Sequence, residues 1–344
     1  MSISYKTRKG LRRFGITLGV LAIVAVLIYA GWVIWVGRYI TYTREGAKLD
    51  LSMDPHLPQG TAAAKPEVGE RVEIIYREPV SDDDNSLPVV ELTSISGYYV
   101  DLADLKESLP TVLYQVEKLP AGTAVMLDMK SIRGEFYYET TVGRKVDESI
   151  DTEQMDRLLE VLHKNDLHAI ARIPAFRDRD YGLHNVPQGL AKKGGKGSLW
   201  MDDKGCYWLD PTKEGTLSYL VRVIMELKSL GFDEVVFTEF CFPDTDKIIF
   251  DDDKAVALKN AAQQLVESCG TNRFFVSFYS DSYSFPLPAG NSRLYLEGVV
   301  AADLPIVVDQ TVTDNPEIQL MFITEATDTR FNDYCVLRPL DTAH

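Results

Sequence analysis

The chain has 344 residues, enough for two small domains or for one α/β barrel with a further segment. Apolar residues make up 45% and charged residues 25%, so most of the chain is expected to fold rather than stay disordered. The formal charge is -15, and a surface this acidic repels polyanions, which argues against nucleic acid or anionic lipid as a partner. Neutral or cationic ligands remain open.

A charge-free apolar run extends from Phe14 to Val36, after five basic residues that have no acidic residue among them. A helix that spans a bilayer needs about 20 apolar residues, whereas the apolar core of a cleaved signal peptide has only about 7 to 15. A buried core helix is seldom apolar on every face. We therefore predict a cytoplasmic tail at residues 1–13 and a single transmembrane anchor at 14–36, with the C-terminal part outside the plasma membrane.

Residues 37–88 are weakly periodic and include two stretches rich in Pro, Gly, Ala and Asp, LPQGTAAAKPEVGE and SDDDNSLP. We interpret this region as a stalk that links the anchor to a folded domain at 89–344. The segment 71–76 (RVEIIY) alternates enough to form a strand, so the folded domain begins either there or at Val89.

From Val89 onward, short apolar runs alternate with longer amphipathic ones, a pattern typical of parallel βαβ units. Predicted strands are 94–100, 123–128, 168–173, 233–240, 273–279, 305–308, 318–324 and a weak one at 335–338. Predicted helices are 102–118, interrupted by Pro110, then 151–164, 212–230 and 252–269. Strands that are apolar on both faces fit a barrel sheathed in helices or a doubly wound sheet, and periodicity does not separate the two.

The sequence contains no established metal, cofactor or nucleophile motif. The cysteines at 206, 241, 269 and 335 are widely spaced, which favours isolated thiols in or near the core and leaves one disulfide open. The KKGGKGS segment lacks the Lys that a phosphate loop requires, and neither H-E-x-x-H nor G-x-S-x-G occurs. We expect no metal and no cofactor.

Polar residues cluster where the predicted strands end, the edge at which parallel α/β folds place their sites. They are Asp128, Lys130, Arg172, Glu239, Asp281, Asp309, Glu325 and Asp328, and the long connection 174–211 adds Arg177, Asp178, Trp200, Trp208 and Asp210. Carboxylates beside aromatic rings suit sugars, because one acid protonates the leaving oxygen, a second attacks or activates water, and flat rings stack on sugar faces.

The stretch from Leu167 to Pro243 contains three motifs: LHAIARIPAFRDRD, CYWLDP and GFDEVVFTEFCFP. It resembles the bacterial "putative glycosyl hydrolase domain" family, whose pattern has I-A-R-x-x-x-F-x-D, W-x-D-P and G-F-D-E-I-Q-F-D-Y-V-R-F-P in the same order. The segment 127–130 (LDMK) is also similar to that family's I-D-V-K. The resemblance implies a (β/α)8 TIM-like barrel, carbohydrate hydrolysis at the strand ends and a location in the cell envelope. Because only a handful of residues follow Arg338, we expect the C-terminal end of the barrel to be short or incomplete.

The chain departs from the family pattern at two positions. Thr238 stands where the family's fourth strand has Asp, Cys241 stands where it has Arg, and Glu239 lies one place beyond. Since strand side chains alternate, such a shift turns the carboxylate away from the site unless the strand ends or bulges there.

Two hypotheses follow, besides that of an anchored scaffold without a ligand. The first is a surface glycoside hydrolase; its catalytic acids are Glu239 with Asp281 or Glu325, and its substrate-binding residues are Asp128, Lys130, Arg172, Asp178, Trp208 and Asp210. The second is a catalytically inactive barrel that binds a glycan or an envelope protein. In either case we expect carbohydrate as the main partner and membrane contact through residues 14–36; the oligomeric state stays open.

Overall fold

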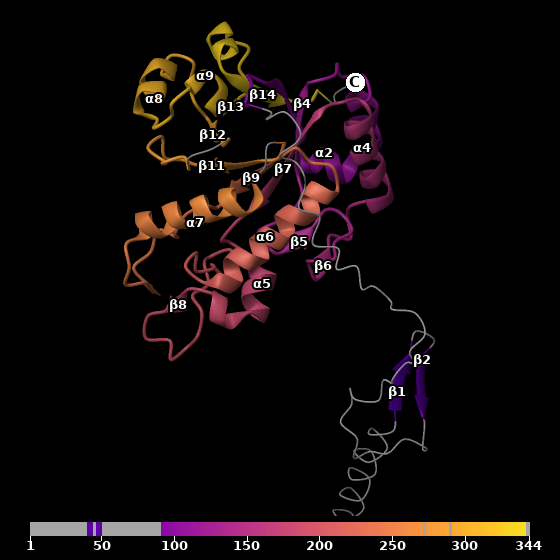
Figure 1. The fold of residues 1–344 in the computed structure, drawn as a ribbon, viewed down its shortest axis with the longest axis vertical. Helices are drawn as coiled ribbons and strands as arrows, with labels where there is room; N and C mark the ends of the chain where they lie inside the picture. Colours follow the sequence, from indigo (N-terminus) through magenta and orange to yellow (C-terminus); the bar gives the residue numbers. More distant parts are fainter. Residues whose placement is uncertain (1–39, 44–45, 50–90, 271–272, 289–290, 342–344) are drawn as a thin grey trace, which may run out of the picture. The chain divides into compact units, whose positions relative to one another are not determined.

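The computed structural model describes residues 40–43, 46–49, 91–270, 273–288 and 291–341 (Figure 1). The predicted anchor at 14–36, most of the predicted stalk and the segment 71–76 lie outside these residues. Within the described part of the chain, no helix has the length and apolar character needed to cross a membrane.

The first unit of structure ends at Arg77, and its described residues form two short strands. β1 (Ile40–Thr43) pairs with β2 (Gly46–Leu49) in antiparallel orientation, with Ile40 opposite Leu49. The stalk interpretation did not anticipate this pair. All further elements belong to the second unit, Glu78–His344.

The second unit is built around a closed barrel of eight parallel strands, which follow one another around the barrel in chain order. The strands are β3 (Ser96–Tyr99), β4 (Ala124–Asp128), β7 (His168–Pro174), β9 (Glu234–Thr238), β11 (Phe275–Tyr279), β12 (Leu294–Glu297), β13 (Leu320–Ile323) and β14 (Cys335–Pro339). The barrel prediction is therefore confirmed, and the doubly wound sheet is excluded.

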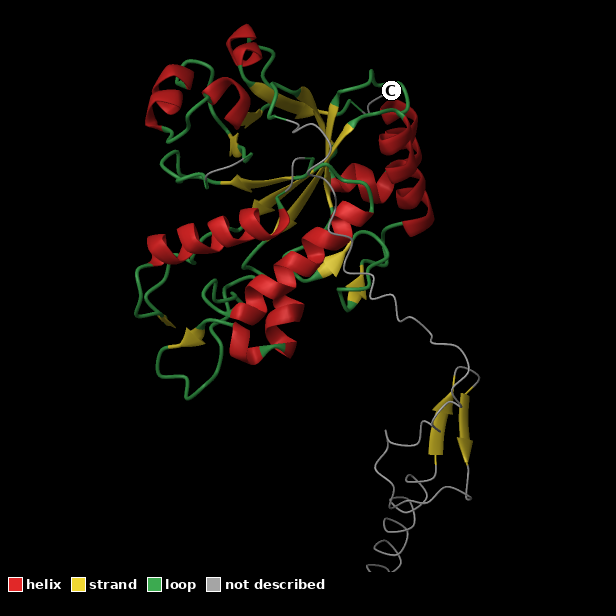
Figure 2. Ribbon diagram, in the orientation of Figure 1, coloured by secondary structure: helices red, strands yellow, loops and turns green. Residues whose placement is uncertain are grey.

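Helices cover the outside of the barrel (Figure 2). The longer ones are α3 (Leu109–Val116), α4 (Thr152–Lys164), α6 (Glu214–Ser229) and α7 (Lys254–Cys269). The shorter helices are α2 (Leu102–Glu107), α5 (Arg179–His184), α8 (Leu304–Gln310) and α9 (Pro316–Gln319), with 3-10 turns η2 (Val186–Gln188) and η3 (Thr329–Asp333). Short strands in the connections are β5 (Glu135–Phe136), β6 (Lys145–Val146), β8 (Ala191–Lys192) and β10 (Ile248–Ile249).

The predicted sixth strand at 305–308 is wrong, since these residues lie in α8. Pro305 occupies the first turn of this helix, a position where a missing N–H costs nothing. Leu304 and Val307 are buried while Ile306 is 59% exposed, which is helical rather than strand spacing. The β-branched run misled the prediction, and the true sixth strand, β12, is only four residues long.

The later βα units are abbreviated. In the described residues between β11 and β12 there is no helix, and none follows β14 as far as Asp341. The barrel is closed by its strands, although its helical sheath is uneven in the described residues.

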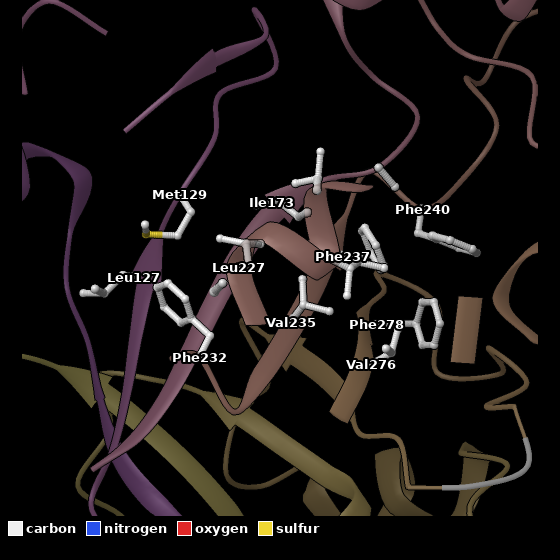
Figure 3. Close-up of a cluster of buried hydrophobic side chains, with 14 of the residues drawn as sticks. Leu127, Met129, Ile173, Leu227, Phe232, Val235, Phe237, Phe240, Val276 and Phe278 are labelled. Atoms are coloured by element: carbon white, nitrogen blue, oxygen red, sulfur yellow. The ribbon is translucent and has the colours of Figure 1, made fainter. Parts of the chain in front are cut away.

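Alternation along the strands divides the apolar residues into an outer and an inner core. Figure 3 shows the outer core, where Leu127, Val235 and Phe237 of the barrel lie beside Leu227 and Phe232. The inner core fills the barrel and consists of Ala124, Met126, Ile170, Val236, Tyr295, Met321, Ile323, Cys335 and Leu337.

A fully buried ion pair lies inside the barrel at the N-terminal ends of the strands. Arg293 Nη1 donates to Glu234 Oε2 at 2.6 Å, and Tyr295 donates its hydroxyl to Glu234 Oε1 at 2.9 Å. His168 Nε2 lies 3.0 Å from Glu234 Oε2. Burial alone would raise the pKa of Glu234, but Arg293 and His168 outweigh it and lower that pKa from 4.5 to about 2.

We expect Glu234→Gln to lower the free energy of unfolding at pH 7 by about 3–5 kcal/mol, because Arg293 is left buried without its counter-charge. Since the folded pKa is below the ordinary value, the carboxylate stabilises the fold above about pH 4.5 and loses this effect as the pH falls towards about 2. Urea unfolding of the full chain between pH 7 and pH 3 measures both effects.

The matched control is Glu153→Gln, which breaks the exposed ion pair with Arg157 on α4. This change should alter the free energy of unfolding by at most about 0.5 kcal/mol. The decrease of that free energy at low pH should be the same as in the wild type. The stabilising role of the ion pair would be refuted if Glu234→Gln were as stable as the wild type at pH 7. It would also be refuted if both proteins lost the same free energy of unfolding between pH 4.5 and pH 3.

Candidate active site

The inward positions at the C-terminal ends of the strands form the mouth of the barrel. Each of these positions lies two residues beyond an inward-facing residue of the same strand, so its side chain also faces inward. These mouth residues are Tyr99 (β3), Asp128 (β4), Arg172 (β7), Thr238 (β9), Tyr279 (β11) and Glu297 (β12). The mouth therefore combines carboxylates, a guanidinium and two phenols.

Asp128 and Arg172 form a two-pronged ion pair across neighbouring strands. They are register partners in β4 and β7, so both side chains face the same way. Arg172 donates from Nε to Asp128 Oδ1 at 2.6 Å and from Nη2 to Oδ2 at 2.9 Å. Burial would lower the pKa of Arg172, but the bonds and charge of Asp128 raise it. The sequence predicted both residues, and the structure brings them together.

Glu239 lies just beyond the end of β9, where the backbone leaves the strand. Its φ is 53°, in the left-handed region that residues other than glycine seldom adopt. Strand alternation therefore no longer sets the direction of its side chain. Arg177 Nη1 donates to Glu239 Oε1 at 3.2 Å, and Arg177 Nε donates to Asp202 Oδ2 at 2.7 Å. Glu239 is thus held by an arginine that a second carboxylate also anchors.

A hollow of about 380 Å³ opens between the ends of β9 and β11. It is lined by Thr238, Glu239, Phe240, Cys241, Tyr279, Ser280, Asp281 and Ser282. The Tyr279 hydroxyl donates to Asp281 Oδ1 at 3.1 Å, and burial, followed by the charges of Asp281 and Glu297, raises the Tyr279 pKa. The two predicted acids Glu239 and Asp281 therefore line the same hollow.

Two further carboxylates, Glu297 and Glu325, act on Tyr99 at the mouth. The pKa of Tyr99 is raised by burial first, then by the charges of Glu325 and Glu297. Glu325 follows β13, is exposed and is not among the residues that line the hollow. Glu297 was missing from the predicted site because its strand, β12, was not recognised. The inward position at the end of each strand is the signal that identifies it.

Lys130 and Asp178 are removed from the mouth. Lys130 Nζ lies 2.6 Å from Asp178 Oδ2, and both side chains are fully buried. The Tyr219 hydroxyl donates to Asp178 Oδ2 at 3.0 Å, and Asp178 Oδ1 accepts from the Tyr181 backbone N–H at the start of α5. As placed, these two predicted substrate-binding residues join the connection after β4 to α5 and α6.

Trp208 and Asp210 likewise serve the local structure. Trp208 is buried, donates from Nε1 to Asp202 Oδ2 at 3.1 Å, and has the Arg177 guanidinium 5.5 Å from its ring centroid. Asp210 Oδ1 accepts from the backbone N–H and the hydroxyl of Thr212 at 2.9 and 2.6 Å. The ring therefore offers no open face to a sugar, and the carboxylate shapes the turn before α6.

The cysteines and the possible metal ligands contribute little to the chemistry of the mouth. All four cysteines are free, and burial, then the charges of Glu239 and Asp281, raise the pKa of Cys241 to about 11. Among the described residues, no three His, Cys, Asp or Glu side chains gather in a way that would hold a metal ion.

The buried position of Lys130 can be tested by Lys130→Met. We expect the free energy of unfolding to fall by about 3–5 kcal/mol, because Asp178 loses its counter-charge inside the protein. The matched control is Lys145→Met, whose exposed ammonium lies 3.8 Å from Asp180 and should contribute less than about 1 kcal/mol. Equal stabilities of the two variants in urea unfolding would contradict this placement of Lys130.

Comparison with solved structures finds similar chains at low identity. A hypothetical protein from Ruminiclostridium thermocellum ATCC 27405 is 21% identical with a TM-score of 0.45, over 53% of this chain and 96% of that one. The glycoside hydrolase domain of PelA from Pseudomonas aeruginosa is 12% identical with a TM-score of 0.45, over 72% and 96%. An exo β-N-acetylglucosaminidase mutant from Vibrio harveyi is 8% identical with a TM-score of 0.45, over 72% and 50%. These similarities carry no functional argument.

Comparison by sequence is more specific. No curated protein matches the chain significantly. The model of a family described as "Putative glycosyl hydrolase domain" matches residues 102–269, from α2 to the end of α7. The matched range contains the three motifs, the Asp128–Arg172 pair and Glu239. The part of the barrel from residue 102 to residue 269 thus belongs to the putative glycosyl hydrolase domain family.

Proposed function

We propose that the barrel binds a carbohydrate at its mouth and hydrolyses a glycosidic bond there, outside the plasma membrane to which residues 14–36 anchor the chain. The observation that carries the catalytic part is that Glu239 and Asp281, from two neighbouring strands, line one hollow. Membership of residues 102–269 in the glycosyl hydrolase domain family supports the substrate class.

Hydrolysis of a glycoside requires one carboxyl group as an acid and a second as a nucleophile or base. The ion pair with Arg177 requires Glu239 in its carboxylate form, which suits a nucleophile or base. Asp281 accepts a hydrogen bond from Tyr279, which stays protonated because the Tyr279 pKa is raised. These contacts hold both carboxylates in place before a sugar arrives.

Sugar hydroxyls are bound by fixed polar groups, and their flat apolar faces pack on aromatic rings. The Asp128–Arg172 pair is partly exposed and held rigidly by its two hydrogen bonds. Tyr99 and Tyr279 lie at the same end of the barrel and are only partly buried. We assign these four side chains to substrate binding.

The second candidate function is binding without cleavage. It is favoured by Thr238, which takes the inward position at the end of β9 where the family pattern has Asp. A hydroxyl does not replace a carboxylate as nucleophile or base in this chemistry. The choice between hydrolysis and binding without cleavage depends on Glu239. For hydrolysis, its carboxylate must reach the substrate from just beyond the end of β9.

The deciding experiment uses the full-length chain with a panel of neutral and amino-sugar polymers. If Glu239 and Asp281 are catalytic, Glu239→Gln and Asp281→Asn should each reduce hydrolysis by about 10²- to 10⁴-fold. Binding of the same polymer, measured by calorimetry, should weaken far less, because the binding side chains are unchanged.

The control is Asp244→Asn, which removes an exposed carboxylate from the loop after β9 and should leave turnover unchanged. Binding without any hydrolysis by the wild type would support the second candidate. Hydrolysis that survives Glu239→Gln at the wild-type rate would refute the role of Glu239.

The proposed topology is tested with alkaline phosphatase, whose disulfides form only outside the reducing cytoplasm. Fused after His344, the phosphatase should be active, because the basic tail before residue 14 keeps the N-terminus inside. Fused directly after Arg13, without the apolar run, it should be inactive. An inactive fusion after His344 in a normally expressed protein would contradict the topology.

A further inference from the structure

Glu297 occupies the inward position at the end of β12, a strand outside the range that the family model matches. Its register partner on β13 is Ile323, an inner-core residue. Two and four residues earlier on the same strand face, Tyr295 and Arg293 bond to Glu234 inside the barrel. Alternation therefore aims Glu297 into the mouth, where the residue is exposed.

Three other carboxylates of the mouth and the hollow are each held by a donor, unlike the exposed Glu325. Asp128 is bound twice by Arg172, Glu239 by Arg177, and Asp281 by the Tyr279 hydroxyl. In the part of the chain that the structure describes, Glu297 accepts no hydrogen bond and forms no ion pair. Glu297 is therefore without the contacts that hold Asp128, Glu239 and Asp281 in place.

The position of Glu297 is central to the mouth. Its charge is among the causes that raise the pKa values of Tyr99, Arg172 and Tyr279, which project from β3, β7 and β11. Tyr279 and Tyr295 are register partners, so Asp281 and Glu297 each lie two residues beyond a paired position. Glu297 thus stands beside the hollow that Glu239 and Asp281 line.

We propose that Glu297 is the acid that protonates the leaving oxygen, while Glu239, paired with Arg177, supplies the anionic carboxylate. This assignment rests on the proposed function, namely hydrolysis at the mouth. It also accounts for a working site without the fourth-strand Asp, since β12 rather than β9 supplies an inward-facing acid.

In the proposed hydrolysis, Glu297 gives one proton to the leaving oxygen. The bond between the anomeric carbon and the glycosidic oxygen breaks, its electron pair goes to the oxygen, and that oxygen takes the proton of Glu297. Water supplies a hydroxyl group to the anomeric carbon. The remaining proton of that water passes through a carboxylate to solvent, and solvent returns a proton to Glu297.

The test compares leaving groups that need a proton with leaving groups that do not. The probes are 4-methylumbelliferyl and 2,4-dinitrophenyl glycosides, both anomers, of glucose, galactose, glucosamine and N-acetylglucosamine, with the full-length chain. For Glu297→Gln, kcat/KM should fall about 10²- to 10⁴-fold on methylumbelliferyl probes and less than about 10-fold on dinitrophenyl probes. Glu297→Asp should recover part of the loss.

Two variants serve as comparison. Glu239→Gln should lose activity on both kinds of probe, because it removes the anion rather than the acid. Asp244→Asn removes an exposed carboxylate from the loop after β9, outside the hollow, and should stay within about threefold of the wild type on both probes, a change of about 0.65 kcal/mol. Urea midpoints that agree among the variants confirm equal folding.

Each outcome is decisive. If the wild type releases nothing from any probe and cuts none of the polymers, hydrolysis itself is refuted and the role of Glu297 falls with it. If the wild type is active and Glu297→Gln equals it on both probes, only the assignment of Glu297 is overturned. An equal loss on both probes, or no recovery with Glu297→Asp, also overturns the role of an acid.

Discussion

Closure of the parallel barrel fixes the direction of every strand side chain, and the rest of the structure depends on this constraint. Along β12, the inward positions place Arg293 in the buried ion pair, Tyr295 in the inner core and Glu297 at the mouth. Along β9, the same alternation places Glu234 opposite Arg293 and leaves Thr238 at the top. The stabilising charge pair and the candidate active site thus lie at opposite ends of the same strand faces.

The Glu234–Arg293 pair also explains how a polar interior is tolerated. Charges buried without partners cost several kcal/mol each, but here both ions carry further hydrogen bonds. Arg293 also donates to the backbone carbonyl oxygens of Ile318 and Thr93, which belong to distant parts of the chain. One side chain therefore links the region before β3 to the end of α9 through the barrel centre.

Much of the fold was predictable because the longer elements have clear periodicity. The helices 151–164 and 252–269 and the strands before Pro243 were placed to within a few residues. β12 was missed because four residues are too few to show alternation, and 305–308 was misassigned because Ile and Val favour strands when no tertiary contact is considered.

The site was predictable only in part, for a related reason. Proximity to a strand end identified Asp128, Arg172, Glu239 and Asp281, but it does not distinguish exposed carboxylates from buried ones. Asp178 shows the difference, because its oxygens are occupied by Lys130, Tyr219 and the start of α5. The partners of a buried carboxylate come from segments far away in the sequence. They depend on tertiary packing, which sequence patterns do not predict.

The departure at the end of β9 has one more chemical consequence. With Cys in place of Arg at position 241, a sulfur atom borders the hollow, and its pKa of about 11 keeps it in the neutral S–H form at neutral pH. Neutral thiols are poor nucleophiles, since alkylation and oxidation proceed through the thiolate. Alkylation and oxidation of Cys241 should therefore be slow at neutral pH, although the side chain borders the hollow.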